Sequence, residues 1–376
     1  MRVDFVVPDL HPRSGGPARN VPALAEALVA HGIDVSVHAI GETAVPPSTH
    51  VVYRLTRGRL PRRLGRSPEL LANLLASTSD IVHAHCLWMR PLAYAARAAR
   101  AHRAPLIISP RGMLAPWAIR RSRVKKALAR LFIHPGALQE AAAWHATSVQ
   151  EADDIRRLGF PQPVFVVPNG VTPDPDPAAS AAYYRRLAPE LAGRRVLLFY
   201  SRFHSKKRVM ELLGEFQSAV ARHPEWHLLL VGIEEEYSVA ELRREAARLG
   251  VEGLVTVLDG LHAPKPYAVA ELLALPTHDE NFGQVVAESL VAGVPVITTT
   301  GTPWQSLNEH SAGRWVELTS FGRELDALMA KSMTDLRSAG RRGQEWARTA
   351  FAWPSVGGAM KEAYRSVLER WSKNPH

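Results

Sequence analysis

The sequence predicts an α/β protein made of two doubly wound domains, each with a parallel sheet covered by helices. Three observations support this prediction. The chain has 376 residues, which is more than one ordinary core accommodates. Strand-like and helix-like patterns alternate along both halves, as they do in βαβ units. Near the middle, the stretch TPDPDPAAS at 172–180 has the proline-rich composition of a linker.

The first half begins with the strand-like run VDFVV at 3–7. The apolar residues after it are spaced as on one face of a helix, and they are Val21, Leu24, Ala25, Leu28 and Val29. Further strands are expected at 33–38, 80–84, 105–109, 143–147 and 163–167.

The second half restarts with RVLLFYSR at 195–202, and its other strands are expected at 227–231, 253–258, 272–276 and 294–299. The pattern defines four segments, which are a first domain at 1–172, a linker at 173–194, a second domain at 195–353 and a C-terminal helix at 354–376. We expect this last helix to pack back on the first domain.

The ends of the predicted strands carry the polar residues of interest. Ligands of doubly wound sheets bind outside the carboxyl ends of the strands. We therefore expect the two domains to face each other across a cleft. The residues placed around it by this rule are Gly15, His85, Arg202 and Glu280.

Composition narrows the class of protein. Apolar residues at 46% and charged residues at 22% are typical of a soluble globular chain. The single cysteine, Cys86, excludes a disulfide framework. The apolar run before Pro8 is too short for a signal peptide, and no segment has the roughly 20 apolar residues that cross a bilayer. These features predict a cytoplasmic protein.

The basic excess lies in the first half. Residues 1–172 carry 22 Lys and Arg against 11 Asp and Glu, whereas the remainder carries 24 against 25. Two clusters supply most of it: Arg54, Arg57, Arg59, Arg62, Arg63 and Arg66, then Arg120, Arg121, Arg123, Lys125, Lys126 and Arg130. Apolar residues interleave with the second cluster, and they are Trp117, Val124, Leu128, Leu131 and Phe132.

That second pattern is typical of a basic amphipathic helix on an anionic membrane surface. Nucleic acid is a competing partner, but no nucleic-acid-binding motif accompanies the charge. Solvated, arginine-rich faces are the plain alternative.

The segment THDENFGQVVAESLVAGVPVITTT at 277–300 contains two carboxylates, Glu280 and Glu288, eight positions apart. A helix that opens near Gly283 would present unpaired N–H groups, with Glu280 in the loop before it. Glu288 would lie on the second turn, roughly 7–8 Å along the axis. Such groups suit a long polyhydroxylated ligand, for example a sugar joined to a ribose. Two solvated glutamates on a surface helix are the alternative.

Cations precede the next expected helix of the second half. Arg202 and Lys207 lie in SRFHSKKRV, where a guanidinium and an ammonium suit a diphosphate. The helix macrodipole disfavours cations at a helix start. The run of Lys206, Lys207 and Arg208 at such a place therefore indicates an anion.

Two motifs of the first half are weaker. Gly15 and Gly16 precede the first helix, where paired glycines let N–H groups approach a phosphate, although an ordinary turn uses them too. The loop lacks the full glycine pattern of an NAD site. His83 and His85 alternate at a strand end, so only one of them is expected to reach the cleft. No third ligand stands at metal spacing, which argues against zinc.

In this order, these pieces resemble the retaining glycosyltransferases of family 4, which have the GT-B fold of two Rossmann-like domains. The matching motifs are SGGPARNVPALAEAL, VHAH, VVPNGV, the R-x4-K spacing of Arg202 and Lys207, ENFGQVVAE and AGVPVITTTGTPW. They cover essentially the whole chain in register. The segment ISPRGMLAPWAIRR resembles a subgroup found among bacterial exopolysaccharide and O-antigen enzymes.

The resemblance implies a role for each matching residue. In the second domain, Arg202 and Lys207 would hold the donor diphosphate and neutralise charge on the departing nucleotide. The donor sugar's hydroxyls would be bound by Glu280 with the backbone of Asn281, Phe282 and Gly283. Glu288 would bind the ribose hydroxyls.

In the first domain, the resemblance implies that the Gly15–Gly16 pair approaches the diphosphate, through Gly16. His85 would sit by the sugar near the reacting carbon. It also implies a reaction that keeps the anomeric configuration and needs neither metal nor cofactor. With Arg202, Lys207 and Glu280, His85 completes the expected catalytic set.

The expected activity is transfer of a hexose from a UDP- or GDP-linked donor to a glycan or polyprenyl-linked acceptor in surface polysaccharide biosynthesis. The enzyme would be cytoplasmic, and peripheral on the inner face of the plasma membrane through its basic first domain. A small-molecule acceptor, a GT-B sugar phosphorylase and a non-enzymatic nucleotide-sugar-binding protein are the alternatives.

The sequence departs from the family pattern at positions that bear on the choice of donor sugar and nucleotide base. Asn281 replaces the usual glycine, which bears on the choice of sugar. The segment LHAPKPYAVAELLAL at 261–275 is shorter than usual, which leaves the nucleotide base open. Arg111, Met113 and Trp117 fall in the acceptor-side loop, and we expect Arg111 to contact the acceptor or the donor phosphate.

Overall fold

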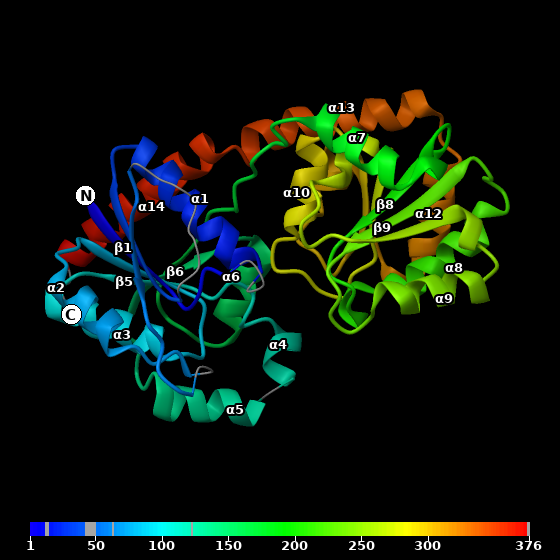
Figure 1. Ribbon diagram of the computed structural model, residues 1–376. Helices are drawn as coiled ribbons and strands as arrows, with labels where there is room; N and C mark the ends of the chain where they lie inside the picture. The colour runs from blue at the N-terminus through cyan, green and yellow to red at the C-terminus, as the bar shows by residue number, and fades with distance from the viewer. Residues whose placement is uncertain (12–14, 42–49, 62–63, 122, 374–376) are drawn as a thin grey trace. The chain divides into compact units, whose positions relative to one another are not determined.

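The computed structural model describes residues 1–11, 15–41, 50–61, 64–121 and 123–373. They form two compact units, one of Met1–Gly170 with Phe351–His376 and one of Val171–Ala350 (Figure 1). Each unit is a parallel sheet with helices on both faces, so the predicted fold class is confirmed.

The first unit holds a seven-stranded sheet in the order β3-β2-β1-β4-β5-β6-β7, and each pairing is parallel. Its strands are β1 (Arg2–Val7), β2 (Asp34–Ile40), β3 (Val52–Thr56), β4 (Ile81–His85), β5 (Leu106–Ser109), β6 (Ala141–Ala146) and β7 (Val164–Val166). Its helices are α1 (Gly16–Ala30), α2 (Pro68–Ala76), α3 (Arg90–His102), α4 (Pro116–Arg120), α5 (Arg123–Leu128), the π-helix η3 (Ala129–Ile133), α6 (Val149–Arg157) and α14 (Trp353–Lys373).

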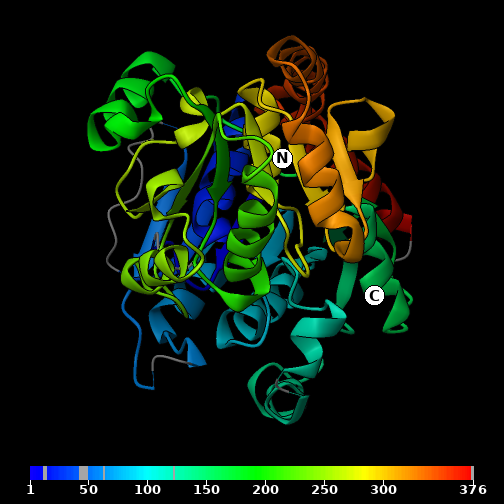
Figure 2. The same ribbon diagram turned by 90° about the vertical axis from the view of Figure 1, so that its right-hand side faces the viewer.

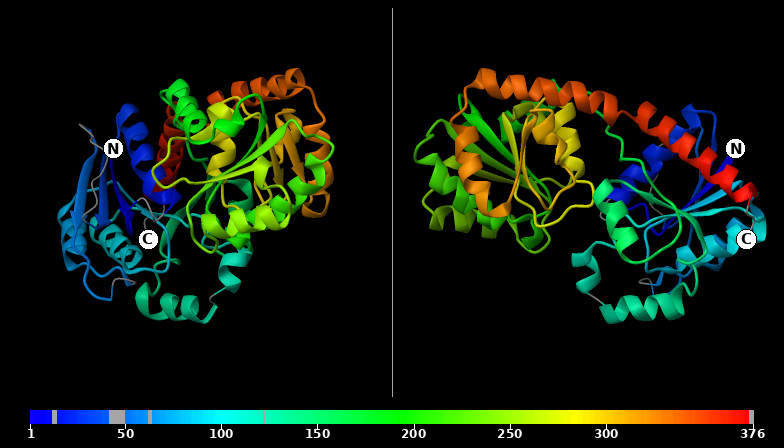
Figure 3. Two further views of the ribbon diagram at one scale, coloured as in Figure 1. Left: turned by 45° about the vertical axis from the view of Figure 1, so that its right-hand side comes forward. Right: turned by 180° about the vertical axis from the view of Figure 1, so that it is seen from behind.

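Strand β1 shows how both faces of this sheet are buried. Val3, Phe5 and Val7 pack in one core with α1 and α14, while Val6 packs in the other with α2 and α3. This is the period of two that a strand imposes. The C-terminal helix α14 runs beside α1, as the front and rear views show (Figures 1 and 3). It thereby contributes to the core of the unit that contains the N-terminus.

The second unit holds a six-stranded parallel sheet in the order β10-β9-β8-β11-β12-β13. Its strands are β8 (Arg195–Tyr200), β9 (Trp226–Gly232), β10 (Val255–Asp259), β11 (Leu272–Leu275), β12 (Val296–Thr299) and β13 (Gly313–Val316). Its helices are α7 (Pro177–Leu187), α8 (Val209–Val220), α9 (Val239–Arg248), α10 (Gln284–Val291), α11 (Ser306–Glu309), α12 (Phe321–Met329) and α13 (Met333–Ala350). Two 3-10 helices matter below, η5 (Ser205–Lys207) and η7 (Pro266–Val269).

Helices cover both faces of the second sheet. Helix α8 contacts α9 and α12, and α10 contacts α13. Figure 1 shows these two groups on opposite sides of the strands, and Figure 2 shows the same unit turned toward the viewer. The parallel order brings the carboxyl ends of β8 and β11 side by side at one edge, because these two strands pair directly.

The segment 173–194 differs from the linker that its composition suggests. Asp176 caps α7 by accepting a hydrogen bond from the backbone N–H of Ala179 at 2.9 Å, and Pro177 takes the first helical position. Aspartate at the cap followed by proline is a helix start rather than a loop. Tyr184 of this helix is buried and donates its hydroxyl to the Pro264 carbonyl. The segment therefore belongs to the second unit.

Strands β3 and β13 are absent from the predicted elements, and both lie at the edge of a sheet. Edge strands are half solvated, and neither has a continuous apolar run: β3 contains Arg54 and β13 contains Arg314. Among the basic residues considered above, Arg62 and Arg63 lie outside the described residues.

Candidate active site

The loops that follow β8 and β11 meet in a buried ion pair. The Nζ atom of Lys207, at the end of η5, contacts Oε1 of Glu280, and the two side chains are 8% and 15% exposed. Burial lowers the pKa of Lys207, and the neighbouring Glu280 carboxylate opposes that shift. The structure thus brings together two of the predicted site residues that are more than 70 positions apart.

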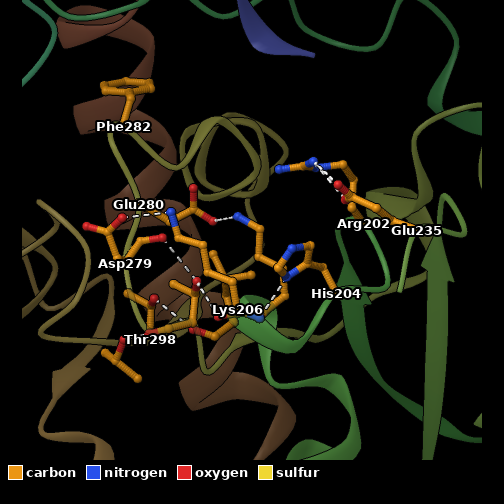
Figure 4. A network of polar contacts seen from close by, with 12 residues as sticks. Arg202, His204, Lys206, Glu235, Asp279, Glu280, Phe282 and Thr298 are labelled. Atoms are coloured by element: carbon orange, nitrogen blue, oxygen red, sulfur yellow. Dashed lines mark hydrogen bonds and ion pairs between the residues drawn. The ribbon is translucent and has the colours of Figure 1, made fainter. Parts of the chain in front are cut away.

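A second pair lies beside the first, in the same order along the chain. Lys206 Nζ lies 2.7 Å from Asp279 Oδ2 (Figure 4). The backbones are joined as well, because the Lys206 carbonyl accepts the N–H of His278 at 2.9 Å and the Thr277 hydroxyl at 3.1 Å. Lys206 and Lys207 therefore pair with Asp279 and Glu280 in the same order. These contacts fix the loop after β8 in register with the loop after β11.

Arg202 follows β8 and points to the loop after β9. Its Nη1 atom lies 2.9 and 2.7 Å from the two carboxylate oxygens of Glu235, and the side chains are 52% and 39% exposed (Figure 4). Arg208 lies 3.2 Å from Glu211. The cations at this helix start thus have carboxylate partners within the protein, and these partners balance their charge without a bound anion.

Helix α10 begins where the sequence places it. Gly283 is its N-cap with φ 75°, a conformation that favours glycine, and a Cβ there would lie 3.0 Å from Nε1 of Trp304. Trp304 is 2% exposed and donates its indole N–H to the Phe282 carbonyl. Asn281 lies in the half-buried loop between Glu280 and Phe282. Trp304 was not among the predicted site residues, although it ends the GTPW motif.

Glu288 lies on the second turn of α10 and is 12% exposed, so the reading as a solvated glutamate is wrong. It lies 3.0 Å from Lys265 Nζ and accepts the Tyr267 hydroxyl at 2.9 Å. Burial and Glu288 raise the pKa of Tyr267 well above its usual value, so the phenol keeps its proton and donates it. Lys265 and Tyr267 both belong to the segment 261–275 before β11. The sequence analysis did not select them, and the signal that could have done so is the presence of two polar side chains among apolar residues.

In the first unit, His85 is the last residue of β4 and is 2% exposed. Arg111 donates from Nη2 to His85 Nδ1 at 3.2 Å and from Nη1 to Asn169 Oδ1 at 2.7 Å. Its guanidinium is therefore engaged by two side chains of this unit, and the expected contact with acceptor or donor phosphate stays a prediction. Nε2 of His85 is buried and has no hydrogen-bond partner among the described residues.

His83 lies on the same face of β4 as His85, with ring centroids 4.2 Å apart. The two residues therefore do not alternate across the sheet, because residues two apart on a strand share a face. That only one of them reaches a cleft stays a prediction. His83 nevertheless has a different role. It is tied to Tyr364 of α14 at 2.7 Å and to Ser109 at 2.8 Å.

This chain of hydrogen bonds continues to the backbone and has one consistent direction. Ser109 Oγ lies 2.6 Å from His145 Nδ1, and His145 Nε2 lies 2.9 Å from the Val167 carbonyl. Since a carbonyl only accepts, His145 donates to it and accepts from Ser109, and His83 in turn donates to Ser109. Burial lowers the pKa of His145 to about 3, so both imidazoles are neutral links in the core.

The remaining candidates of the first unit are Gly15, Gly16, Met113 and Trp117, and each has a local conformation or contact in the structure. Gly15 is the N-cap of α1 with φ 85°, and Gly16 is the first residue of the helix. Met113 Sδ accepts the backbone N–H of Leu87 at 3.1 Å. Trp117 is 40% exposed, and the Arg121 guanidinium lies 5.3 Å from its ring centroid.

Within the described ranges, no group of three or more His, Cys, Asp and Glu residues has an arrangement that could hold a metal ion. In the same ranges, no helix combines the length and the apolar character needed to cross a membrane.

The comparisons with known proteins agree with this architecture. Residues 15–170 match the family model of a glycosyl transferase 4-like domain, and residues 194–331 match that of glycosyl transferases group 1. A GDP-mannose:cellobiosyl-diphosphopolyprenol alpha-mannosyltransferase of Xanthomonas campestris is 24% identical over 98% of this chain and 97% of its own length. A D-inositol 3-phosphate glycosyltransferase of Thermobispora bispora is 29% identical over 60% of this chain and 56% of its own length.

Solved structures show the same fold. A sucrose-phosphate synthase of Thermosynechococcus elongatus has a TM-score of 0.75 and 18% identity, covering 98% of this chain and 100% of its own. The Anabaena protein HepE in complex with UDP and glucose has a TM-score of 0.74 and 18% identity, covering 97% and 100%. The two parallel-sheet units therefore have the GT-B fold of these neighbours. The chain belongs to the family-4-like glycosyltransferases.

Proposed function

We propose that this glycosyltransferase moves a hexose from a UDP- or GDP-linked donor to a glycan or polyprenyl-linked acceptor, with retention of configuration and without a metal. The observation that carries the donor site is the buried pair of Lys207 and Glu280 directly before α10. An ammonium that suits a phosphate and a carboxylate that suits sugar hydroxyls are in direct contact there, which supports this proposal. Glu288 lies about one and a half helical turns beyond the start of α10, and its carboxylate is fixed by two partners. Its oxygens would accept the hydroxyls of a ribose.

The chemistry follows from these charges. Cleavage of the anomeric C–O bond sends an electron pair to the diphosphate, while the sugar carbon becomes oxocarbenium-like. Preorganised cations that stabilise the leaving group lower this barrier without a strong protein base. Lys207 and Arg202 would supply those charges. The acceptor hydroxyl oxygen would attack the sugar carbon from the face that the diphosphate leaves and pass its proton to the departing phosphate oxygen.

The relatives support a nucleotide-sugar donor, and their names differ in the nucleotide and the sugar. The name of the Xanthomonas relative specifies GDP-mannose and a diphosphopolyprenol acceptor, and HepE binds UDP and glucose. The roles in surface polysaccharide synthesis and at the inner membrane face are part of the same proposal.

The test is a transfer assay with UDP- and GDP-hexoses and a polyprenyl-diphosphate saccharide, run with and without EDTA. We expect EDTA-resistant transfer and an NMR spectrum of the product with the donor's anomeric configuration. Glu280→Gln and Lys207→Met should each reduce transfer, while Glu252→Gln at the exposed start of the 3-10 helix η6 (Glu252–Leu254) should not. Turnover with orthophosphate as the sole acceptor would instead identify a phosphorylase, and an inverted product would refute retention.

The membrane part of the proposal rests on the segment from α4 to η3. Its exposed apolar side chains are Trp117, Leu128, Leu131 and Phe132, at 40%, 50%, 63% and 63% exposure. Its exposed or half-exposed basic side chains are Arg120, Arg121, Lys125, Lys126 and Arg130. The side chains of Arg123 and Val124 lie outside the described set. Exposed apolar groups beside cations suit an anionic lipid surface rather than water.

Sedimentation with phosphatidylcholine vesicles that contain or lack phosphatidylglycerol tests this surface. Binding should require the anionic lipid and fall with salt, and the double variant Leu131→Ser with Phe132→Ser should weaken it. Absence of binding at low salt would refute the membrane clause and leave the transfer proposal untouched.

A further inference from the structure

In the second unit, the loop after β12 holds the loop before α10 at two points. At the first point, the backbone N–H of Glu280 donates to the Gly301 carbonyl at 2.8 Å. At the second point, the Phe282 carbonyl accepts the indole N–H of Trp304. Asn281 is the one residue between these two anchored residues. The backbone on both sides of Asn281 is therefore fixed by a single loop.

The two loops are in close contact at both points. At Gly301, a Cβ would lie 2.2 Å from the carbonyl oxygen of His278, so the two backbones touch directly. At Gly283, beside the second point, a Cβ would lie 3.0 Å from Nε1 of Trp304. Glycine at these positions allows the close approach on which the two hydrogen bonds depend.

The indole of Trp304 is itself held in place by other aromatic rings. Its centroid lies 5.4 Å from that of Phe282 and 5.9 Å from that of Trp346 on α13, which it meets edge-on. Trp346 in turn stacks on His310 at 4.2 Å. Trp304 is 2% exposed, so its N–H belongs to a rigid ring whose direction is set by the packing of this unit.

The hydrogen bond from Trp304 sets the orientation of the peptide that joins Phe282 and Gly283. A trans peptide is planar, and its C=O and N–H groups point in opposite directions. Because the indole holds the carbonyl, the N–H of Gly283 faces away from Trp304 at the start of α10. The first N–H groups of a helix have no partner within the helix, so they are the ones that a ligand can use.

We propose that Trp304 is a positioning residue of the donor site, which fixes the backbone around Asn281 so that the site recognises the sugar of the donor in one orientation. This inference rests on the proposed function, because it takes Glu280 and the backbone after it as the sugar contacts. Trp304 acts through the Phe282–Gly283 peptide and does not itself contact the donor.

The proposed ribose contact has supports of its own. Glu288 lies 3.0 Å from Lys265 Nζ and accepts the Tyr267 hydroxyl at 2.9 Å. Neither of these contacts involves the loop after β12. Loss of the Trp304 indole N–H should therefore weaken recognition of the sugar and leave recognition of the nucleotide unchanged.

The experiment uses two changes that remove this N–H. Trp304→Phe removes it together with part of the ring, and replacement of Trp304 by 3-benzothienylalanine exchanges the N–H for sulfur while the ring keeps its shape. Trp226→Phe is the matched control. Trp226 is also fully buried in the second unit and donates its indole N–H to a backbone carbonyl, that of Met329, at 3.0 Å. It is the first residue of β9, at the amino end of that strand.

Hydrogen exchange without ligand tests the anchoring directly. A buried carbonyl that loses its donor is costly, so both changes at Trp304 should speed exchange in peptides that cover 277–291 by about 10-fold. Trp226→Phe should leave the exchange of these peptides unchanged. Unchanged exchange after both changes at Trp304 would overturn the proposal.

Calorimetry tests the role in the donor site. Its probes are UDP-glucose and GDP-mannose, each compared with UDP or GDP alone. Both changes at Trp304 should weaken binding of the nucleotide sugar that the wild type binds by about 10-fold and keep the nucleotide alone within about 2-fold, whereas Trp226→Phe should alter neither. Equal weakening of nucleotide sugar and nucleotide, or no weakening, would refute the positioning role. Hydrogen exchange needs no donor, so a wild type that binds no nucleotide sugar would count against the proposed function alone.

Discussion

Removing the carboxylate of Glu280 should destabilise the second unit far more than removing both members of its ion pair. In Glu280→Ala the Lys207 ammonium stays at a site where the side chain is 8% exposed, without its counter-charge. Breaking such a buried pair on one side typically costs about 3–5 kcal/mol, whereas replacing both members by apolar residues is often neutral. We expect the lower end, about 3 kcal/mol, because 15% of the Glu280 side chain is exposed. The double variant Lys207→Met with Glu280→Leu should lie within about 1 kcal/mol of the wild type.

Hydrogen exchange followed by peptide mass measures this effect, because peptides from 171–350 report on the second unit while those of the first serve as an internal reference. The neighbouring pair of Lys206 and Asp279 is the matched control. Its side chains are 18% and 19% exposed, so its coupling energy should be smaller. Single variants that each cost under about 1 kcal/mol and add in the double variant would show that no buried ion pair exists in solution. The Lys207 and Glu280 variants should all lose transfer activity, including the double variant that keeps its stability, so the stability measurement shows whether activity is lost with the site alone or with the fold.

Three further outcomes are expected. In Gly170→Ala the new Cβ would overlap the Trp353 ring, so the first unit should lose about 1–3 kcal/mol, measured as a lower melting temperature. Tyr267→Phe removes a donor to Glu288 and should raise the donor KM by about 10-fold with kcat maintained, since a hydrogen bond to a charged group contributes about 1.5 kcal/mol or more. Acid should destabilise the first unit, because burial lowers the pKa of His83 and of His145 in the folded state, the latter to about 3. The unfolded chain binds protons first, so this stability is present above about pH 6.5 and is lost below it, by up to about 1.4 kcal/mol per pH unit for each histidine. Denaturant titrations at pH 7 and pH 5.5 would reveal a flat profile if these rings were exposed.

The sequence allows us to predict that Lys207 and Glu280 lie close together, but not that their side chains form an ion pair. Parallel strands bring their carboxyl ends to one edge, so residues just after β8 and β11 had to be neighbours. Which charges satisfy one another depends on side-chain directions in two loops about 70 positions apart, which no local pattern encodes. The same limit concealed Glu235 as the partner of Arg202.

Local rules account for the other differences. At Asp176 the proline-rich composition suggested a linker, yet Asp followed by Pro177 is the chemistry of a helix start. At His83 and His85, the strand period of two puts both rings on one face, and only their separate partners distinguish them. The contact of Arg111 with His85 joins residues 26 positions apart, and the positive φ of Arg111 is a backbone feature that the sequence does not display.

The two kinds of ion pair in the second unit suggest how a diphosphate gains access to cations that already have partners. Arg202 and Glu235 are exposed, and such pairs contribute at most about 1 kcal/mol, so a phosphate can displace this carboxylate at little cost. The buried pair need not break at all. The Lys207 ammonium has three donors, of which Glu280 engages one, and the second oxygen of Glu280 can still accept a sugar hydroxyl. The pairing also answers a difficulty in the proposed site, because an unpaired carboxylate would repel the donor's phosphates. With Lys207 attached, Glu280 can bind the sugar close to that negative charge, and this is why we expect the two residues to act as one unit.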